Sequence, residues 1–145
     1  MGFRRRLGRL AMTAAAIVAA ASGITVVAAG PAHAAVGCQI TYQRLTWTKG
    51  FGFQGNVTID NLADPINGWT LTWTFPDAQW LVDSWSAVFV QTGFQVTATN
   101  AAYDGYIPSG GTVEIGFQAR TFPFVPNHAP QDFALNGVPC VRVIV

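Results

Sequence analysis

The acidic residues are the first candidates for chemistry, because two carboxylates about 5–9 Å apart can cleave a glycosidic bond. The chain has seven acidic residues, and Glu114 is its one glutamate. Most of the aspartates stand in expected turns or at strand ends, where Asp is favoured for its local hydrogen bonds: Asp60, Asp64, Asp77 and Asp132. We therefore expect no catalytic pair.

The two histidines, His33 and His128, suggest one other kind of chemistry, a copper oxygenase with an N-terminal histidine brace. That site would need cleavage before His33, with His128 as the second ligand. The cleavage motif described below instead predicts Ala35 as the new N-terminus, and His128 lies in a Pro-rich stretch typical of a loop. No Ser–His–Asp arrangement, metal-ligand cluster or phosphate-binding loop is visible. The sequence thus predicts no enzyme, no metal site and no cofactor.

Three aromatic residues have local surroundings that fit either ligand binding or partial burial. Trp47 lies among Arg, Thr, Lys and Gly, Trp85 lies between two serines, and Tyr103 lies in a turn-rich stretch. An exposed ring offers flat area to the apolar face of a sugar, and each stacked ring contributes roughly 1–3 kcal/mol by analogy with base stacking. The alternative is that each ring is a partly buried plug. Local pattern alone leaves both interpretations open.

The strand that follows Trp85 bears on where this ring points. Because side chains alternate along a strand, Trp85 joins the core face if Ala87 and Phe89 point inward. It joins the outer face if Val88 and Val90 point inward instead. All four residues are apolar, so the phase of Trp85 is ambiguous.

Short strands are the elements that must position these residues. The clearest is NGWTLTWTF, residues 67–75, in which four large apolar residues alternate with three threonines. This alternation predicts that Trp69 and Trp73 lie in the core and that the threonine face is solvated. Similar runs, separated by Gly- and Pro-rich breaks, indicate about eight strands. We therefore expect an all-β fold, an antiparallel β-sandwich of the immunoglobulin-like or jelly-roll-like kind.

The N-terminal segment, residues 1–34, has the composition of an export signal. A cluster of arginines precedes an Ala- and Val-rich run over residues 10–30, and residues 32–34 form a small-x-small cleavage site. The run is long enough to consider a membrane anchor, but its alanine content and the cleavage motif favour removal. The arginine cluster weakly resembles a twin-arginine signal, which leaves the export route open. We expect residues 35–145 to form one secreted, extracellular domain.

Removal of the signal makes the chain mildly acidic. Four basic residues then stand against seven acidic ones, a formal charge of −3, whereas a nucleic-acid partner would need clustered Lys and Arg. We expect a neutral partner, no membrane contact and a monomer. The two cysteines, Cys38 and Cys140, stand at the two ends of the domain and should pair in an exported chain. Closing a loop of about 100 residues would stabilise the fold by roughly 4–5 kcal/mol.

Several short segments in combination resemble one known family, the family 2 carbohydrate-binding modules of the bacterial cellulose-binding type. They are NGWTLTWTFP, the aromatic before Asp-Gly, IPSGG, GFQ and LNGVPC, and the resemblance runs from Cys38 to Cys140. It implies a β-sandwich with a disulfide between the chain ends. It also implies a non-catalytic module that adsorbs to crystalline cellulose through a flat strip of three exposed aromatics.

Position by position, the resemblance assigns this aromatic strip to Trp47, Trp85 and Tyr103. It also implies that four polar residues contact the polymer: Asn56, Asp83, Glu114 and Gln118. The chain departs from the family at Tyr103, where Trp is usual, at Leu45 and Trp80, where polar residues are common, and in two longer loops. Xylan or chitin as the polymer, and a module or remnant of a secreted glycoside hydrolase, therefore stay as alternatives. An adhesive or structural sandwich that uses the aromatics for protein contacts is a further alternative.

Overall fold

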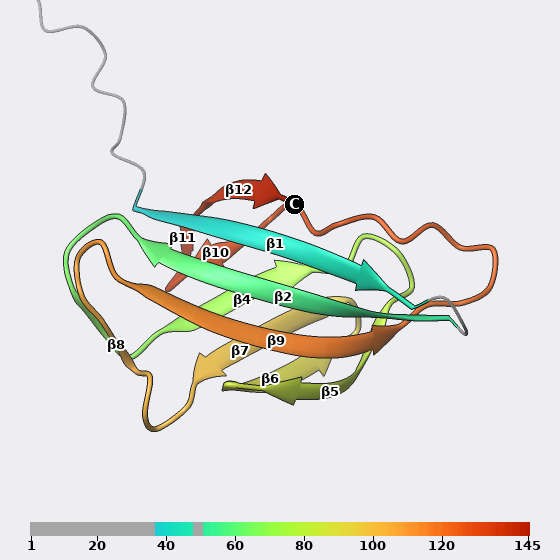
Figure 1. The fold of residues 1–145 in the computed structure, drawn as a ribbon, viewed down its shortest axis with the longest axis horizontal. Coiled ribbons are helices and arrows are strands. Elements are labelled where there is room, and N and C mark those ends of the chain that lie inside the picture. The colour runs from blue at the N-terminus through green and yellow to red at the C-terminus, as the bar shows by residue number, and fades with distance from the viewer. Residues whose placement is uncertain (1–36, 48–50) are drawn as a thin grey trace, which may run out of the picture. The chain divides into compact units, whose positions relative to one another are not determined.

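Every regular element in the described part of the chain is a β-strand (Figure 1). The computed structural model describes residues 37–47 and 51–145. Eight strands have four or more residues: β1 (Cys38–Thr46), β2 (Gly52–Asn61), β4 (Thr70–Thr74), β5 (Trp80–Trp85), β6 (Ala87–Thr92), β7 (Gln95–Asn100), β9 (Thr112–Arg120) and β12 (Val141–Ile144). Four have two residues: β3 (Ile66–Asn67), β8 (Tyr106–Ile107), β10 (Ala134–Leu135) and β11 (Val138–Pro139). The predicted all-β class is confirmed.

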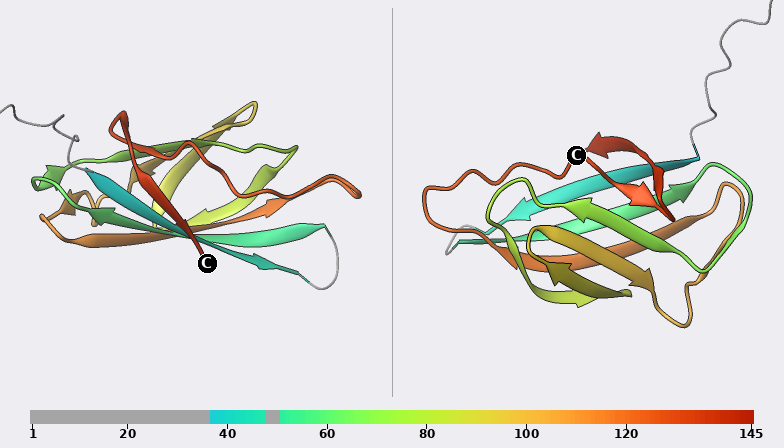
Figure 2. Two further views of the ribbon diagram at one scale, coloured as in Figure 1. Left: turned by 90° about the horizontal axis from the view of Figure 1, so that it is seen from above. Right: turned by 180° about the vertical axis from the view of Figure 1, so that it is seen from behind.

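Two five-stranded sheets form the two layers of the sandwich, which the view from above in Figure 2 separates. The front sheet has the order β12-β1-β2-β9-β5, and the back sheet has the order β11-β10-β4-β7-β6. Strands β3 and β8 form a separate pair. Neighbouring strands are antiparallel except for β1 and β12, which are parallel.

The predicted disulfide between Cys38 and Cys140 is present, with a Cα–Cα distance of 4.8 Å and a sequence separation of 102 residues. Cys38 is the first residue of β1, and Cys140 directly precedes β12. Both strands therefore leave the bridge in the same direction. This common origin explains why β12 is parallel to β1.

The core lies between the two sheets and is rich in aromatic rings. Trp69 and Trp73 are each 1% exposed, which confirms the prediction from residues 67–75. Trp73 stacks on Phe117 of β9, with ring centroids 5.7 Å apart and an interplanar angle of 27°. Tyr42 also lies in the core, and burial raises the pKa of its phenol well above the ordinary value. The rings thus bind the two sheets together.

The predicted export signal and its cleavage site lie outside the described residues. In the part that is described, no helix has the length and apolar character needed to cross a bilayer.

Candidate functional site

The outward surface of the front sheet, called the front face below, collects most of the residues singled out from the sequence. Pairing registers across β2, β9 and β5 form three consecutive rows on this face: Gly52–Arg120–Trp80, Gln54–Gln118–Asp83 and Asn56–Gly116–Trp85. A fourth row pairs Thr58 with Glu114. Directly opposed residues share one face of a sheet. The front face therefore brings together the four polar residues assigned by resemblance: Asn56, Asp83, Glu114 and Gln118.

Trp85 lies flat on the backbone of the front sheet. A Cβ atom added to Gly116 would lie 2.2 Å from Cζ2 and 2.5 Å from Nε1 of the Trp85 indole, so the ring occupies the space that the glycine leaves empty. The side chain is 38% exposed. One face of the ring therefore covers the strand, and the other faces solvent.

The chain changes layer directly after Trp85. Ser86 has a φ of 62°, in the left-handed region that is uncommon for residues other than glycine. It carries the chain from β5 in the front sheet to β6 in the back sheet. Ala87 and Phe89 then pack against the core, while Trp85 stays on the front face. Alternation predicted that Trp85 joins the core face if Ala87 and Phe89 point inward. Both pack against the core and Trp85 does not, so alternation fails at this position.

Trp47 also packs on a strand glycine, at the other end of the front face. The glycine under each ring, Gly116 for Trp85 and Gly52 for Trp47, is called its seat below. A Cβ atom added to Gly52 would lie 2.3 Å from Cζ3 and 2.5 Å from Cε3 of Trp47. The backbone N–H of Trp47 also donates a hydrogen bond to the Gly52 carbonyl at 3.2 Å. The side chain is 37% exposed. Trp47 is thus held on the surface of the sheet and is absent from the core.

Tyr103 lies outside the two sheets, in the connection between β7 and β8, and is 78% exposed. Asn100, the last residue of β7, pairs with the residue two positions after Trp85. The connection therefore begins beside the Trp85 end of the front face, and Figure 1 shows it at that end of the sandwich. The Trp69 indole N–H anchors it by donating to the Asp104 carbonyl at 2.8 Å. The connection that carries Tyr103 thus lies at the Trp85 end of the front face.

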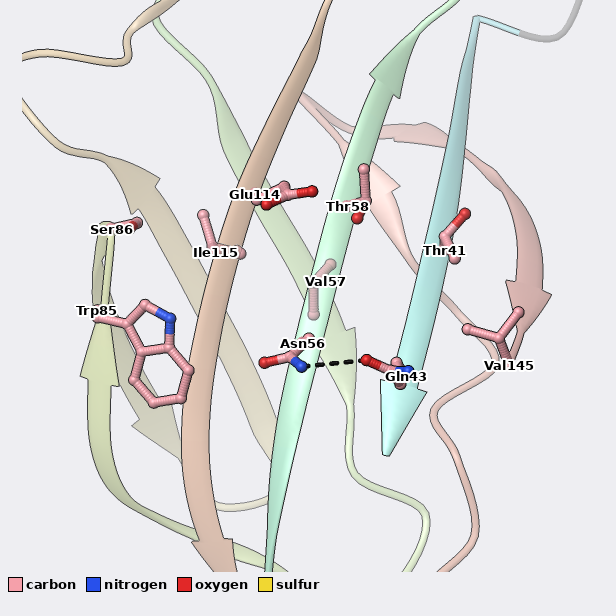
Figure 3. A pocket seen from close by; sticks show the side chains of 10 residues that line it. All are labelled: Thr41, Gln43, Asn56, Val57, Thr58, Trp85, Ser86, Glu114, Ile115 and Val145. Atoms are coloured by element: carbon pink, nitrogen blue, oxygen red, sulfur yellow. Dashed lines mark hydrogen bonds between the residues drawn. The ribbon is translucent and has the colours of Figure 1, made fainter. Parts of the chain in front are cut away.

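A hollow of about 450 Å³ lies beside Trp85 on the front face (Figure 3). Its polar lining includes Asn56 and Glu114. The Asn56 amide is fixed from two sides, because it accepts a hydrogen bond from Gln54 at 2.9 Å and donates one to Gln43 at 3.2 Å. Among the described residues, the Glu114 carboxylate has no hydrogen-bond partner. The hollow therefore combines an ordered amide with a carboxylate that is available to a ligand.

A β-bulge in β5 puts a further tryptophan on the front face. The pairing of β5 with β9 slips between Leu81 and Asp83, which makes Val82 the extra residue of the bulge. Trp80 and Trp85 are an odd number of positions apart, so in a regular strand they would point to opposite faces. The bulge brings both to the front face.

Sequence reasoning missed the two glycine seats. Gly52 and Gly116 stand inside strands, where glycine weakens packing and often marks the close approach of another group. That signal was present in the sequence, but it does not say which ring approaches. The bulge at Val82 and the left-handed Ser86 have no signal in the hydrophobic pattern.

His128, the one histidine among the described residues, lies in a contact between two loops. Its backbone N–H donates to Asp77 Oδ2 at 2.6 Å, and its Nδ1 lies 3.1 Å from the same oxygen. Within residues 37–47 and 51–145, no three His, Cys, Asp or Glu side chains gather as metal ligands would.

The fold is a sandwich closed by a disulfide, and one open face carries aromatic rings, an ordered amide and carboxylates. These features are those of a β-sandwich binding module. The family model described as "Cellulose binding domain" matches residues 38–140. This match covers well over half of the sequence, and the chain belongs to that family. The resemblance read from the sequence is confirmed.

Relatives of this chain include both enzymes and separate binding domains. "Endoglucanase CelA" of Streptomyces lividans is 41% identical over 137 residues, which cover 94% of this chain and 28% of the relative. The solution structure of the chitin-binding domain of Chi18aC from Streptomyces coelicolor has a TM-score of 0.57 at 29% identity, covering 71% of this chain and 93% of that domain. The cellulose-binding family 2 domain from ScLPMO10C has a TM-score of 0.51 at 28% identity, covering 68% and 92%. The chain thus spans less than a third of the enzyme but nearly the full length of both domains.

Proposed function

We propose that this protein is a secreted, non-catalytic module that adsorbs to cellulose through the aromatic strip of Trp47, Trp85 and Tyr103. One observation carries the proposal: two partly exposed indole rings pack on strand glycines, in the space that a Cβ atom would occupy. A core ring would be enclosed on both faces, and an incidental surface ring would need no glycine beneath it. Such rings offer rigid apolar planes to the axial C–H groups of glucose.

The glycine seats order the strip before a ligand arrives. Each indole fills the place of a missing Cβ, so it cannot move toward the sheet and few rotamers remain open to it. An ordered side chain avoids the loss of about 0.5–1.5 kcal/mol that immobilising a mobile side chain costs on binding. This arrangement suits a solid polymer, because the polymer surface cannot adapt its own shape.

In this proposal the polar residues around the strip contact the hydroxyl groups of the polymer. Asp83 and Gln118 share the row between the rows of the two glycine seats. Asn56 lies beside the seat of Trp85, and Glu114 lies two residues further along β9. Sugar hydroxyls both donate and accept hydrogen bonds, and these amides and carboxylates supply both kinds of partner.

The carboxylates of the front face are spaced for binding rather than for hydrolysis. Asp83 lies opposite Gln118, four residues from Glu114 along β9, so the Cα atoms of Asp83 and Glu114 are roughly 14 Å apart. Side chains on one face stand roughly perpendicular to the sheet, so their carboxyl groups keep about this separation. The carboxyl pairs of glycosidases lie about 5–9.5 Å apart. This spacing supports the non-catalytic part of the proposal, and the disulfide supports an oxidising, extracellular location.

Chitin is the second candidate polymer, because the domain of Chi18aC that resembles this chain is named as chitin-binding. Cellulose comes first because the family is described as a cellulose binding domain and because the 41% identical relative is named an endoglucanase.

Depletion of the purified protein by insoluble polysaccharides tests the proposal. Microcrystalline cellulose, chitin and insoluble xylan would be incubated with the protein, and the unbound fraction would be measured. We expect adsorption to cellulose that Trp85→Ala weakens and that Val90→Ala, an exposed position on the back sheet, leaves unchanged. Adsorption to chitin alone would select the second candidate. Adsorption to none of them, with recovery of a partner protein instead, would support the adhesive interpretation.

A further inference from the structure

Beside Trp47, the front face continues into a second group of aromatic rings, called the side patch: Phe51, Trp80 and Phe122. The rings of Trp80 and Phe122 pack together, with centroids 4.8 Å apart and an interplanar angle of 52°. With Trp47 and Arg120, the side patch lines a hollow of about 450 Å³. All three rings are substantially exposed. Contiguous exposed apolar side chains of this size usually mark a contact surface.

The Trp80–Phe122 ring pair is held in place from behind. Gln79, directly before Trp80, is buried, and its amide donates to Asn127 Oδ1 and to the His128 carbonyl, both at 3.0 Å. Both acceptors belong to the loop that follows Phe122. These hydrogen bonds therefore tie the start of β5, which carries Trp80, to the loop that follows Phe122.

Trp80 does not lie on the line of the aromatic strip. The seat of Trp47 is Gly52 on β2, and the seat of Trp85 is Gly116, one strand across and four residues further along. Trp80 stands in the row of Gly52 but two strands across. From strand spacings of about 4.8 Å and about 3.3 Å per residue, the Trp80 Cα atom lies roughly 9 Å from the line that joins the two seats. A single extended sugar chain along that line therefore runs to one side of Trp80.

We propose that the side patch contacts a second sugar chain, next to the chain on the aromatic strip, in the surface of the same solid polysaccharide. This inference rests on the proposed function. Continuity identifies the occupant, because the side patch shares a hollow with Trp47, so a solid surface that lies on Trp47 extends to the edge of the side patch. Trp80 and Phe122 offer ring faces to the sugar, and the guanidinium of Arg120 offers N–H donors to its oxygens.

Contact with two chains at once has a functional consequence. Only an assembled solid holds two sugar chains side by side, whereas dissolved chains are separate. A second contact on the same body raises the overall affinity without any change in the first. The side patch thus makes the protein selective for the solid over dissolved chains.

Comparison of solid and dissolved polymer tests this inference. Adsorption isotherms on microcrystalline cellulose and affinities for dissolved hydroxyethylcellulose would be measured for the wild type, Trp80→Ala and Phe122→Ala. We expect each substitution to weaken adsorption to the solid at least about fivefold, the lower end for one stacked ring, and to leave the affinity for dissolved chains unchanged. Phe122 is 52% exposed and lies outside the strands, so its variant keeps the test valid if Trp80→Ala unfolds. Phe94→Ala, which removes an exposed ring from the β6–β7 turn, should change neither value.

The outcomes separate this inference from the proposed function. If the wild type binds the solid and shows no measurable affinity for dissolved chains, weaker adsorption of Trp80→Ala to the solid also supports the inference. Equal losses on both forms overturn it, because Trp80 then contacts the same chain as the strip. No loss on the solid overturns it as well, and the proposed function still stands if Trp85→Ala weakens adsorption. A wild type that adsorbs to neither form refutes both.

Discussion

Gly116→Ala is the sharpest test of the seated rings, because it displaces the Trp85 ring without removing any part of it. The added Cβ would lie 2.2 Å from Trp85 Cζ2, whereas carbon atoms in contact are about 3.5–4.0 Å apart. The indole must therefore move away from the sheet by at least about 1.3 Å, or rotate out of its place. Either movement changes the height of this ring relative to Trp47, which keeps its own seat on Gly52.

The backbone should tolerate this alanine. Gly116 is not among the glycines with positive φ, and alanine at a compatible glycine position stabilises a protein by about 0.4–1 kcal/mol through the unfolded state. A displaced, off-rotamer indole costs about 0.5–1.5 kcal/mol. The two effects nearly cancel, so we expect the thermal midpoint to move by less than about 4 °C.

Adsorption should respond far more than stability. One stacked ring contributes about 1–3 kcal/mol, so the partition coefficient on microcrystalline cellulose should fall at least about fivefold. Gly37→Ala is the matched control, because a Cβ added there meets nothing nearer than Val138 Cγ1 at 3.7 Å. In a double-mutant cycle with Trp85→Ala, the effect of Gly116→Ala should vanish, since no ring remains to be displaced.

Two results would refute this reasoning. If Gly116→Ala adsorbs like the wild type while Trp85→Ala does not, the ring binds without its seat, and a rigid plane is not what the polymer needs. If Gly116→Ala weakens adsorption equally in the Trp85→Ala background, the alanine acts elsewhere, either on Asn56 beside it or on the sheet itself.

Three further predictions concern the strip and the disulfide. Trp85→Ala should weaken adsorption to cellulose at least about fivefold while circular dichroism shows a folded protein with a similar midpoint; an unfolded variant would mean that the ring belongs to the core. Tyr103→Trp should strengthen adsorption, because an indole has a larger face than a phenol, and an unchanged isotherm would count against a role for this position. Replacing Cys38 and Cys140 by Ser should lower the free energy of unfolding in urea by roughly 4–5 kcal/mol, since the bridge spans 102 residues. A loss below about 1 kcal/mol would contradict the chain-entropy argument for this bridge.

The core and the disulfide could be predicted from the sequence, because each follows from a simple physical rule. Burial on one face imposes a period of two, and Trp69 and Trp73 keep that period through an unbroken stretch of chain. An oxidising compartment pairs Cys38 with Cys140 when no other cysteine is present. Neither rule requires knowledge of which strands are neighbours.

The place of Trp85 could not be derived from the period, because two irregularities interrupt it. The bulge at Val82 changes the phase before Trp85, and the left-handed Ser86 changes it again afterwards. Phe89 is therefore packed against the core although it is an even number of positions from an exposed Trp85. Resemblance to a family does not depend on the period, because it compares whole segments, irregularities included.

The front face contains several features that a sandwich built only for stability would avoid. Glycine inside a strand costs about 0.5–1 kcal/mol relative to alanine, and a left-handed residue other than glycine costs about 1–2 kcal/mol. Gly52, Gly116 and Ser86 together therefore cost about 2–4 kcal/mol. The disulfide alone offsets this amount, at roughly 4–5 kcal/mol. β-branched residues would pair better at both glycine positions, but any Cβ there would collide with a tryptophan ring. The two glycines are thus explained by the tryptophan rings that pack on them. The proposed function gives those rings a reason to be held in place, because a solid polymer cannot adapt its shape to a mobile side chain.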